Sequence, residues 1–158
     1  MELIIVMIFI SFSMALVTPS LSRIAKTIEL KATAKRVSGI LRYYRSEAVN
    51  KRRVYQILFD SDLRRVQVRS VGEDGEGKER DGRDPKKTYS LPDGIQIGEM
   101  DIPSPQYFSD LPAIEFYPNG GSNGGALLLK SPDDKGFKIS VHFLTGRVKV
   151  EKEEGIGR

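Results

Sequence analysis

A single carboxylate, Glu2, precedes an apolar stretch, residues 3–17, in which only Ser11 and Ser13 are polar. A charged side chain drawn to the centre of a bilayer costs roughly 2.5 to 3.5 kcal/mol, so a carboxylate beside such a stretch usually has a task. The alternative is that Glu2 stays at the membrane interface, because the first turn of a helix favours a negative charge. The residues alone leave both interpretations open.

The chain offers little for catalysis. The sequence contains one histidine, His142, and no cysteine. In the predicted strand, His142 lies on the same side as Lys138 and Ser140, so we expect His142 to face solvent. Nucleophilic catalysis needs a nucleophile, a base and an orienting group that converge, and no pattern in the chain supplies them. The sequence therefore predicts a protein that is not an enzyme and that binds no metal or cofactor.

The apolar stretch predicts a membrane helix that is slightly too short. At 1.5 Å per residue it spans about 25 Å, against ~30 Å for the hydrocarbon layer. A cleaved signal peptide is the competing interpretation, but no basic residue precedes the stretch and no small-residue cleavage pattern follows it. The flanking basic residues all follow the stretch, which by the positive-inside rule would leave the rest of the chain in the cytoplasm.

Beyond Pro19 the pattern predicts that the same helix continues to about residue 50. Its apolar residues recur at steps of three and four, as in an amphipathic helix; they are Leu21, Ile24, Ile28, Val37, Ile40, Leu41, Tyr44 and Ala48. Pro19 should kink the helix without ending it. A helix of this length is a rod of ~75 Å, so its first third must lie in lipid or against other chains.

From residue 54 the apolar period changes to two, which predicts β-strands. We expect strands at 54–60, 63–69, 88–91, 95–98, 113–117, 126–130, 137–143 and around Val148 and Val150. In the strand 137–143, the residues expected to be buried are Phe137, Ile139, Val141 and Phe143. Residues 118–125 are expected to form a flexible turn, and residues 72–87, which are rich in glycine and charge, a mobile loop.

These elements predict an α+β protein, in which a long N-terminal helix packs on an antiparallel sheet. Residues 1–20 would be the membrane and assembly part of the helix, and residues 21–53 its amphipathic half. Residues 54–151 would form the sheet domain, and residues 152–158 a C-terminal tail.

Three groups of residues resemble type IV pilin-like proteins, and specifically the H-class minor pseudopilins of type II secretion. Glu2 and Pro19 have the seventeen-residue spacing of the family's glutamate and proline. The segment 45–48 looks like the Arg-Ser-Glu-Ala sequence common in this class. Residues that resemble the closing strands of the H-class domain are Ile114, Phe116, Pro118, Gly120, Ser122, Gly124, Gly125, Leu144, Thr145, Gly146, Arg147 and Val148.

The resemblance implies a pilin-like fold and a structural role in the tip of a periplasmic pseudopilus. Glu2 and Pro19 would then be assembly residues, with Glu2 meeting the N-terminal amine of an adjacent subunit. The implied partners are other major and minor pseudopilins, the inner-membrane assembly platform, membrane lipid and, for a precursor, the prepilin peptidase; N-terminal methylation is also implied. The implied location is the bacterial inner membrane, spanned once, with the C-terminal domain in the periplasm.

The beginning of the chain departs from the family pattern. The basic leader, the Gly-Phe cleavage site and the first mature residues of the family have no counterpart, and Met1 takes what would be the fourth mature position. We expect an in-frame Gly-Phe upstream of Met1. The added residues would lengthen the apolar stretch toward ~20 residues and place basic charge on the cytoplasmic side.

A second function is suggested by the C-terminal basic residues Arg147 and Lys149. The segment 146–149 is close to the Gly-Arg-x-Arg element associated with DNA binding in minor type IV pilins of the FimT/FimU type. Lys149 keeps the charge but lacks the planar fork of arginine, and three acidic residues follow it: Glu151, Glu153 and Glu154. We therefore expect secretion rather than DNA uptake.

A third option is an inner-membrane protein that never polymerises. In such a protein the apolar face of the helix beyond the membrane would have no partner.

Overall fold

A long helix followed by β-strands makes up the computed structural model, which describes residues 2–71, 87–133 and 135–153, with the backbone alone for residue 2 and residues 12–24. Within these ranges the elements are α1 (Glu2–Lys51), β1 (Val54–Asp60), β2 (Arg65–Val71), β3 (Lys87–Ser90), β4 (Gln96–Asp101), β5 (Ala113–Phe116), β6 (Gly125–Lys130), β7 (Gly136–Val141) and β8 (Val148–Glu153). The predicted fold class is confirmed, and each predicted strand is present.

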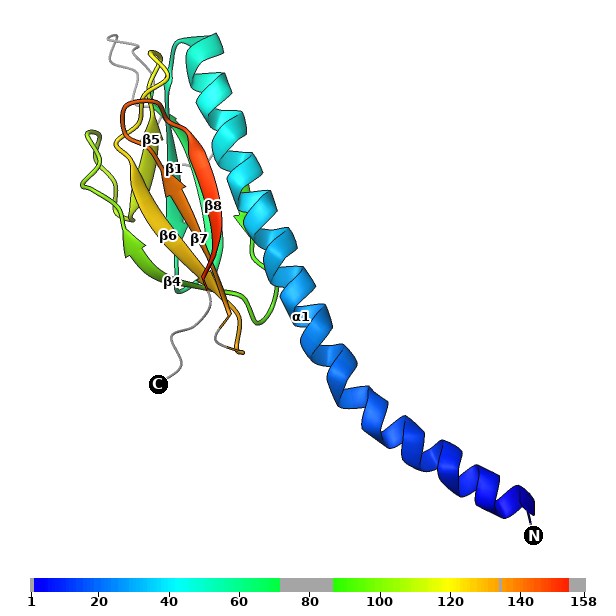
Figure 1. The fold of residues 1–158 in the computed structure, drawn as a ribbon. Helices are drawn as coiled ribbons and strands as arrows, with labels where there is room; N and C mark the ends of the chain where they lie inside the picture. The colour runs from blue at the N-terminus through cyan, green and yellow to red at the C-terminus, as the bar shows by residue number, and fades with distance from the viewer. Residues whose placement is uncertain (1, 72–86, 134, 154–158) are drawn as a thin grey trace.

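The strands form two sheets, whereas the sequence had suggested one. The first sheet has the order β3-β2-β1-β5 and the second β4-β6-β7-β8, and neighbouring strands are antiparallel throughout. The chain passes from the first sheet to the second between β3 and β4, returns at β5, and passes again at β6 (Figure 1). An alternating pattern shows that a strand is half-buried, but it does not show which strand lies beside it.

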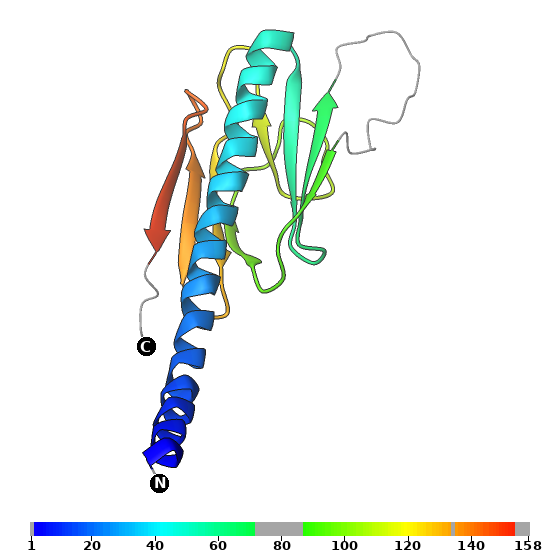
Figure 2. The same cartoon turned by 90° about the vertical axis from the view of Figure 1, so that its right-hand side faces the viewer.

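The C-terminal half of α1 packs against both sheets. Its most deeply buried apolar residues follow steps of three and four; they are Leu30, Ala34, Val37, Leu41, Tyr44 and Ala48. They join one core with side chains from β1, β5, β6 and β7. Figure 2 shows the helix running across the space between the two sheets. The prediction that Ile28 belongs to the buried stripe is wrong, because 63% of its surface is exposed and the core begins at Leu30.

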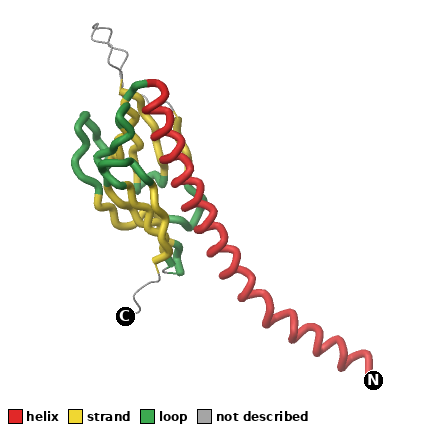
Figure 3. The backbone as a smooth tube through the Cα atoms, turned by 45° about the horizontal axis from the view of Figure 1, so that its top comes forward, coloured by secondary structure: helices red, strands yellow, loops and turns green. Residues whose placement is uncertain are grey.

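The N-terminal half of α1 projects beyond the sheets (Figures 1 and 3). The helix continues through Pro19, as predicted, and bends gently along its N-terminal part (Figure 1). Consecutive apolar side chains from Leu3 to Ile10 are 53% to 81% exposed. Among the described residues, no helix contains a stretch that is both long and apolar enough to cross a membrane.

Two further predictions concern the turns after β5 and β7. Phe143 is 58% exposed, contrary to the prediction, because β7 ends at Val141 and Phe143 lies in the turn that follows. The chain turns at residues 118–120, and Gly120, Gly121, Ser122 and Gly124 are buried; Ser122 pairs with Phe116 as an isolated bridge. The predicted mobile loop lies outside the described residues except for Lys87. Residues 152 and 153 belong to β8, and the rest of the predicted tail lies outside the described residues.

Candidate assembly surface

The projecting part of α1 is the first candidate surface. The backbones of Glu2 and Pro19 lie in the helix, and their side chains are outside the described part of the structure. The eight apolar side chains at positions 3–10 are all exposed, so this segment presents an apolar surface around the helix. A helix that is apolar all round is normally buried in lipid or in protein.

Arg45 fastens α1 to the loops at the far end of the domain. Its Nε donates hydrogen bonds to the carbonyl oxygens of Thr145, at 2.9 Å, and Gly120, at 3.3 Å. One turn earlier on the helix, Arg42 Nη2 donates to the carbonyl oxygen of Val148 at 3.2 Å. The segments that carry the resemblance, on α1, after β5 and before β8, therefore meet at one place.

Gly146 allows this close approach. It has a φ of 59°, in the left-handed region, and its amide donates to the carbonyl oxygen of His142 at 2.7 Å. A Cβ at this position would lie 2.7 Å from the carbonyl oxygen of Gly120 and 2.9 Å from Nε of Arg45. Only glycine fits between the helix and the two loops without displacing them.

The turn held by Arg45 exposes several side chains. Phe143 and Leu144 are 58% and 69% exposed, and the ring of His142 stacks on that of Phe143 with centroids 5.3 Å apart. His142 is exposed, as predicted. The turn therefore presents two exposed apolar side chains beside the contact between Arg45 and Thr145.

Of the two predicted DNA-contact residues, Arg147 immediately precedes β8 and Lys149 is its second residue, and both are exposed. The ammonium of Lys149 forms an ion pair with Glu151 at 2.8 Å, whereas Arg147 makes no ion pair with any described residue. An ammonium beside a carboxylate attracts phosphate less strongly than a free one. Arg147 is therefore the more available cation of the two.

A buried carboxylate in β5, Glu115, was not singled out by the sequence. It is fully buried and accepts four hydrogen bonds: from the backbone amides of Gln106 at 2.8 Å and Tyr107 at 3.0 Å, from Gln56 Nε2 at 2.9 Å, and from the Tyr117 hydroxyl at 2.8 Å. The alternation of Ile114, Glu115 and Phe116 would place the carboxylate in solvent. Instead, the loop between β4 and β5 covers that side of the strand.

The Tyr117 hydroxyl gives a prediction about alkaline pH. Burial and the hydrogen bond to Glu115 raise the pKa of Tyr117 above its ordinary value. A raised pKa in the folded state means that stability is fully present below the unfolded pKa, about 10 for tyrosine, and is lost as the pH rises above it. We expect the free energy of unfolding, measured with urea by circular dichroism, to fall above about pH 10.

The Tyr117→Phe variant separates this group from other tyrosines such as Tyr44, whose pKa is also raised, first by burial. At neutral pH we expect the variant to be less stable by about 1.5 to 3 kcal/mol, the usual contribution of a hydrogen bond to a charged group. Its loss of stability between about pH 9 and pH 11 should be smaller than that of the parent chain. An equal loss in both proteins would contradict the assignment to Tyr117.

Among the described residues, no group of histidine, aspartate and glutamate side chains could hold a metal ion. Neither protein-family models nor curated proteins match this sequence.

Two proteins of known structure are similar to the chain in fold. The minor pseudopilin EpsH from the type 2 secretion system of Vibrio cholerae has a TM-score of 0.57 at 18% identity, and the match covers 78% of this chain and 97% of EpsH. The type IV minor pilin FimU of Pseudomonas aeruginosa has a TM-score of 0.57 at 19% identity, covering 82% of this chain and 96% of FimU. The chain therefore has the pilin-like fold of these two minor subunits.

Proposed function

We propose that this protein is a minor pseudopilin, a non-catalytic structural subunit at the tip of the periplasmic pseudopilus of a type II protein secretion system. The observation that carries the proposal is the projecting half of α1, whose side chains at positions 3–10 are apolar and exposed. The helix has 50 residues, about 75 Å, and among its described side chains the first buried one is Leu30.

The proposed partners follow from this surface. The projecting helix would lie side by side with the helices of other major and minor pseudopilins, which removes its apolar side chains from water. Before assembly it would sit in the lipid of the inner membrane, with the sheets in the periplasm, and would be handled there by the prepilin peptidase and the assembly platform. Glu2 would meet the N-terminal amine of a neighbouring subunit, because an opposite charge compensates a carboxylate in an apolar environment.

Replacing Glu2 tests the assembly role. In a host with a type II secretion system, we expect Glu2→Ala to abolish co-purification of the protein with the major pseudopilin, while its total amount and the protease resistance of its folded domain stay unchanged. The matched control is Glu29→Ala, which removes an exposed carboxylate farther along the same helix. Normal incorporation of Glu2→Ala would remove the role proposed for Glu2.

Cross-linking tests the packing of the helices directly. The chain contains no cysteine, so a pair of introduced cysteines at Ile5 and Ile10 forms disulfides only through the new thiols. We expect oxidation to give ladders of cross-linked subunits in cells that assemble the pseudopilus, and none when the same pair is placed at the exposed Lys31 and Lys35.

The second candidate is a minor type IV pilin of the FimT/FimU type, in pilus assembly or DNA uptake. The exposed Arg147, held on the turn that Arg45 fixes, favours it, whereas the ion pair of Lys149 with Glu151 favours secretion. Gel shifts with double-stranded DNA distinguish the two. Salt-sensitive binding that is lost in Arg147→Glu would support DNA uptake, and no binding would support secretion.

A further inference from the structure

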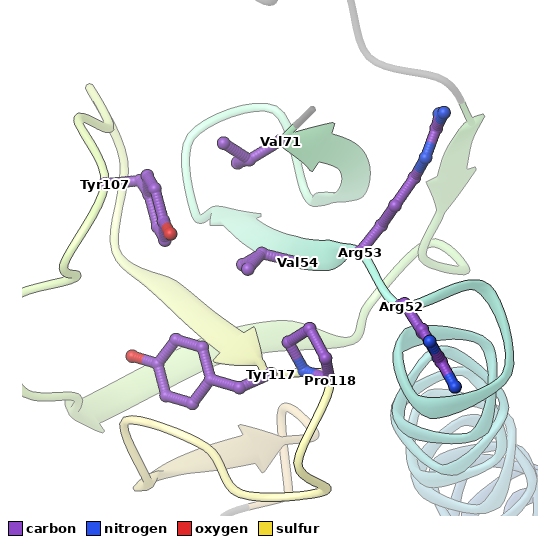
Figure 4. A pocket seen from close by; sticks show the side chains of 7 residues that line it. All are labelled: Arg52, Arg53, Val54, Val71, Tyr107, Tyr117 and Pro118. Atoms are coloured by element: carbon purple, nitrogen blue, oxygen red, sulfur yellow. The ribbon is translucent and has the colours of Figure 1, made fainter. Parts of the chain in front are cut away.

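A pocket of about 180 Å³ lies where α1 ends and β1 begins. Its lining residues are Arg52, Arg53, Val54, Val71, Tyr107, Tyr117 and Pro118. Figure 4 shows Val54 in the middle, with the two tyrosines on one side, the arginines on the other, and Pro118 between Tyr117 and Arg52. For comparison, an apolar cavity of roughly 150 Å³ holds a benzene-sized molecule, so this pocket fits one bulky side chain.

The two tyrosines of the pocket are held by one carboxylate. Glu115 accepts hydrogen bonds from the Tyr107 amide at 3.0 Å and from the Tyr117 hydroxyl at 2.8 Å. Gln56 Nε2 also donates to the carbonyl oxygen of Tyr107 at 3.1 Å. A surface loop would normally leave Tyr107 free to move. Here the pocket is already formed, which lowers the entropic cost of binding.

The arginines supply positive charge at the rim. Both Arg52 and Arg53 are exposed, and neither forms an ion pair with any described residue. Their side chains diverge from consecutive positions (Figure 4). Two separated guanidinium groups match two carboxylates on different residues better than a single carboxylate.

The backbone of Arg52 ends α1 in the left-handed conformation. Arg52 has a φ of 50° directly after α1, and the amide of Arg53 donates to the carbonyl oxygen of Ala48 at 3.2 Å, which is the hydrogen bond that closes a Schellman motif. Glycine is the preferred residue at this position because the left-handed conformation strains other side chains. Glycine would relieve this strain, so replacing Arg52 with glycine tests whether the arginine side chain contributes to binding.

The chain's own acidic segment does not supply the occupant. Residues 72–86 follow Val71 and contain several carboxylates, but Pro85 is their only apolar side chain, and no aromatic or branched aliphatic residue is present. They can offer charge to the arginines but no bulky apolar group to the pocket between Tyr107 and Tyr117. This segment therefore does not supply a matching occupant.

We infer that this pocket binds an acidic peptide segment of another protein, one whose bulky apolar side chain enters between Tyr107 and Tyr117 while its carboxylates face Arg52 and Arg53. This partner would dock at the opposite end of α1 from Glu2 (Figure 1). The inference is independent of the proposed function, because it requires no assembly through the projecting helix.

Peptide binding tests the inference. The full chain in a neutral detergent is titrated into a dye-labelled Asp-Glu-Phe-Glu-Asp peptide, and fluorescence anisotropy is measured at low and high salt. We expect saturable binding that weakens with salt. Binding should be at least about tenfold weaker for Asp-Glu-Gly-Glu-Asp and for Lys-Lys-Phe-Lys-Lys, because these peptides lack the apolar group or reverse the charge. Equal affinity for all three peptides, or no binding, overturns the inference.

Substitutions locate the bound peptide. We expect Arg53→Glu to weaken binding about tenfold, whereas Lys31→Glu, the same charge change about 30 Å away along α1, should have little effect. Val71→Trp should fill the pocket and weaken binding, whereas Leu63→Trp, at the exposed turn between β1 and β2, should not. Binding that is insensitive to Val71→Trp would place the peptide on the basic helix instead and overturn the inference.

Arg52→Gly separates a functional side chain from a structural one. Glycine relieves the positive φ, so we expect the midpoint of unfolding to rise, while the affinity for the Phe-containing peptide falls several-fold because one guanidinium is lost. A rise in stability with unchanged affinity would show that Arg52 does not contact the peptide, and this result would overturn the inference.

Discussion

Replacing Glu115 with alanine is expected to destabilise the protein by about 3 to 5 kcal/mol, the usual cost of removing one partner of a buried charged network. The substitution leaves the amides of Gln106 and Tyr107, the amide group of Gln56 and the hydroxyl of Tyr117 without their acceptor. Because domains are stable by only about 5 to 15 kcal/mol, this is a large share of the total. Urea unfolding followed by circular dichroism measures the loss.

The matched control is Glu99→Ala, which removes an exposed carboxylate from β4 and should change stability by less than about 0.5 kcal/mol. Hydrogen exchange adds a local measurement. In Glu115→Ala, the amides of Gln106 and Tyr107 should exchange faster, because they lose their acceptor. If Glu115→Ala were as stable as Glu99→Ala, the four hydrogen bonds would not contribute to stability.

Gly146→Ala is expected to cost about 2 to 4 kcal/mol, from the strain of crowding an added methyl group into a packed site and from its left-handed backbone. The new Cβ would lie 2.7 Å from the carbonyl oxygen of Gly120 and 2.9 Å from Nε of Arg45. The turn before β8 must then move away from α1, and the hydrogen bond from Arg45 to Thr145 is lost. Unfolding experiments measure the cost.

Gly39→Ala is the matched control, with the opposite expected sign. Gly39 lies on the exposed side of α1, and a Cβ there would meet nothing within 4 Å. Alanine inside a helix is more favourable than glycine by about 0.8 to 1 kcal/mol, so this variant should be more stable than the parent chain. A similar loss of stability in both variants would indicate that Gly146 is not tightly packed.

The elements of this protein could be predicted from residue periodicity. Steps of three and four residues along α1, including Val37, Leu41, Tyr44 and Ala48, and the alternation in each strand reflect local geometry that neighbouring residues set on their own. The resemblance also pointed to the segments around Arg45, Gly120 and Gly146, which the structure brings together. It did not give the reason, which is a hydrogen-bonded contact between residues far apart in sequence.

The sequence fails where burial depends on a distant segment. Glu115 alternates with Ile114 and Phe116 as a solvent-facing residue would, yet it is fully buried because the loop before β5 covers it. Gln56, its register partner on β1, was the available clue, since it too is a polar residue in an otherwise apolar strand. Two polar residues that face each other in neighbouring strands indicate a buried polar pair. This clue can be used only when the pairing of the two strands is known.

The sequence determined the long helix, the strands and the apolar segment that follows Glu2, because each of these depends on the types and spacing of nearby residues. Only the tertiary structure decided the division into two sheets, the burial of Glu115, the fastening of α1 by Arg45 and the pocket beside Arg52. These features depend on which segments meet in space, and side-chain period carries no information about a partner distant in the chain.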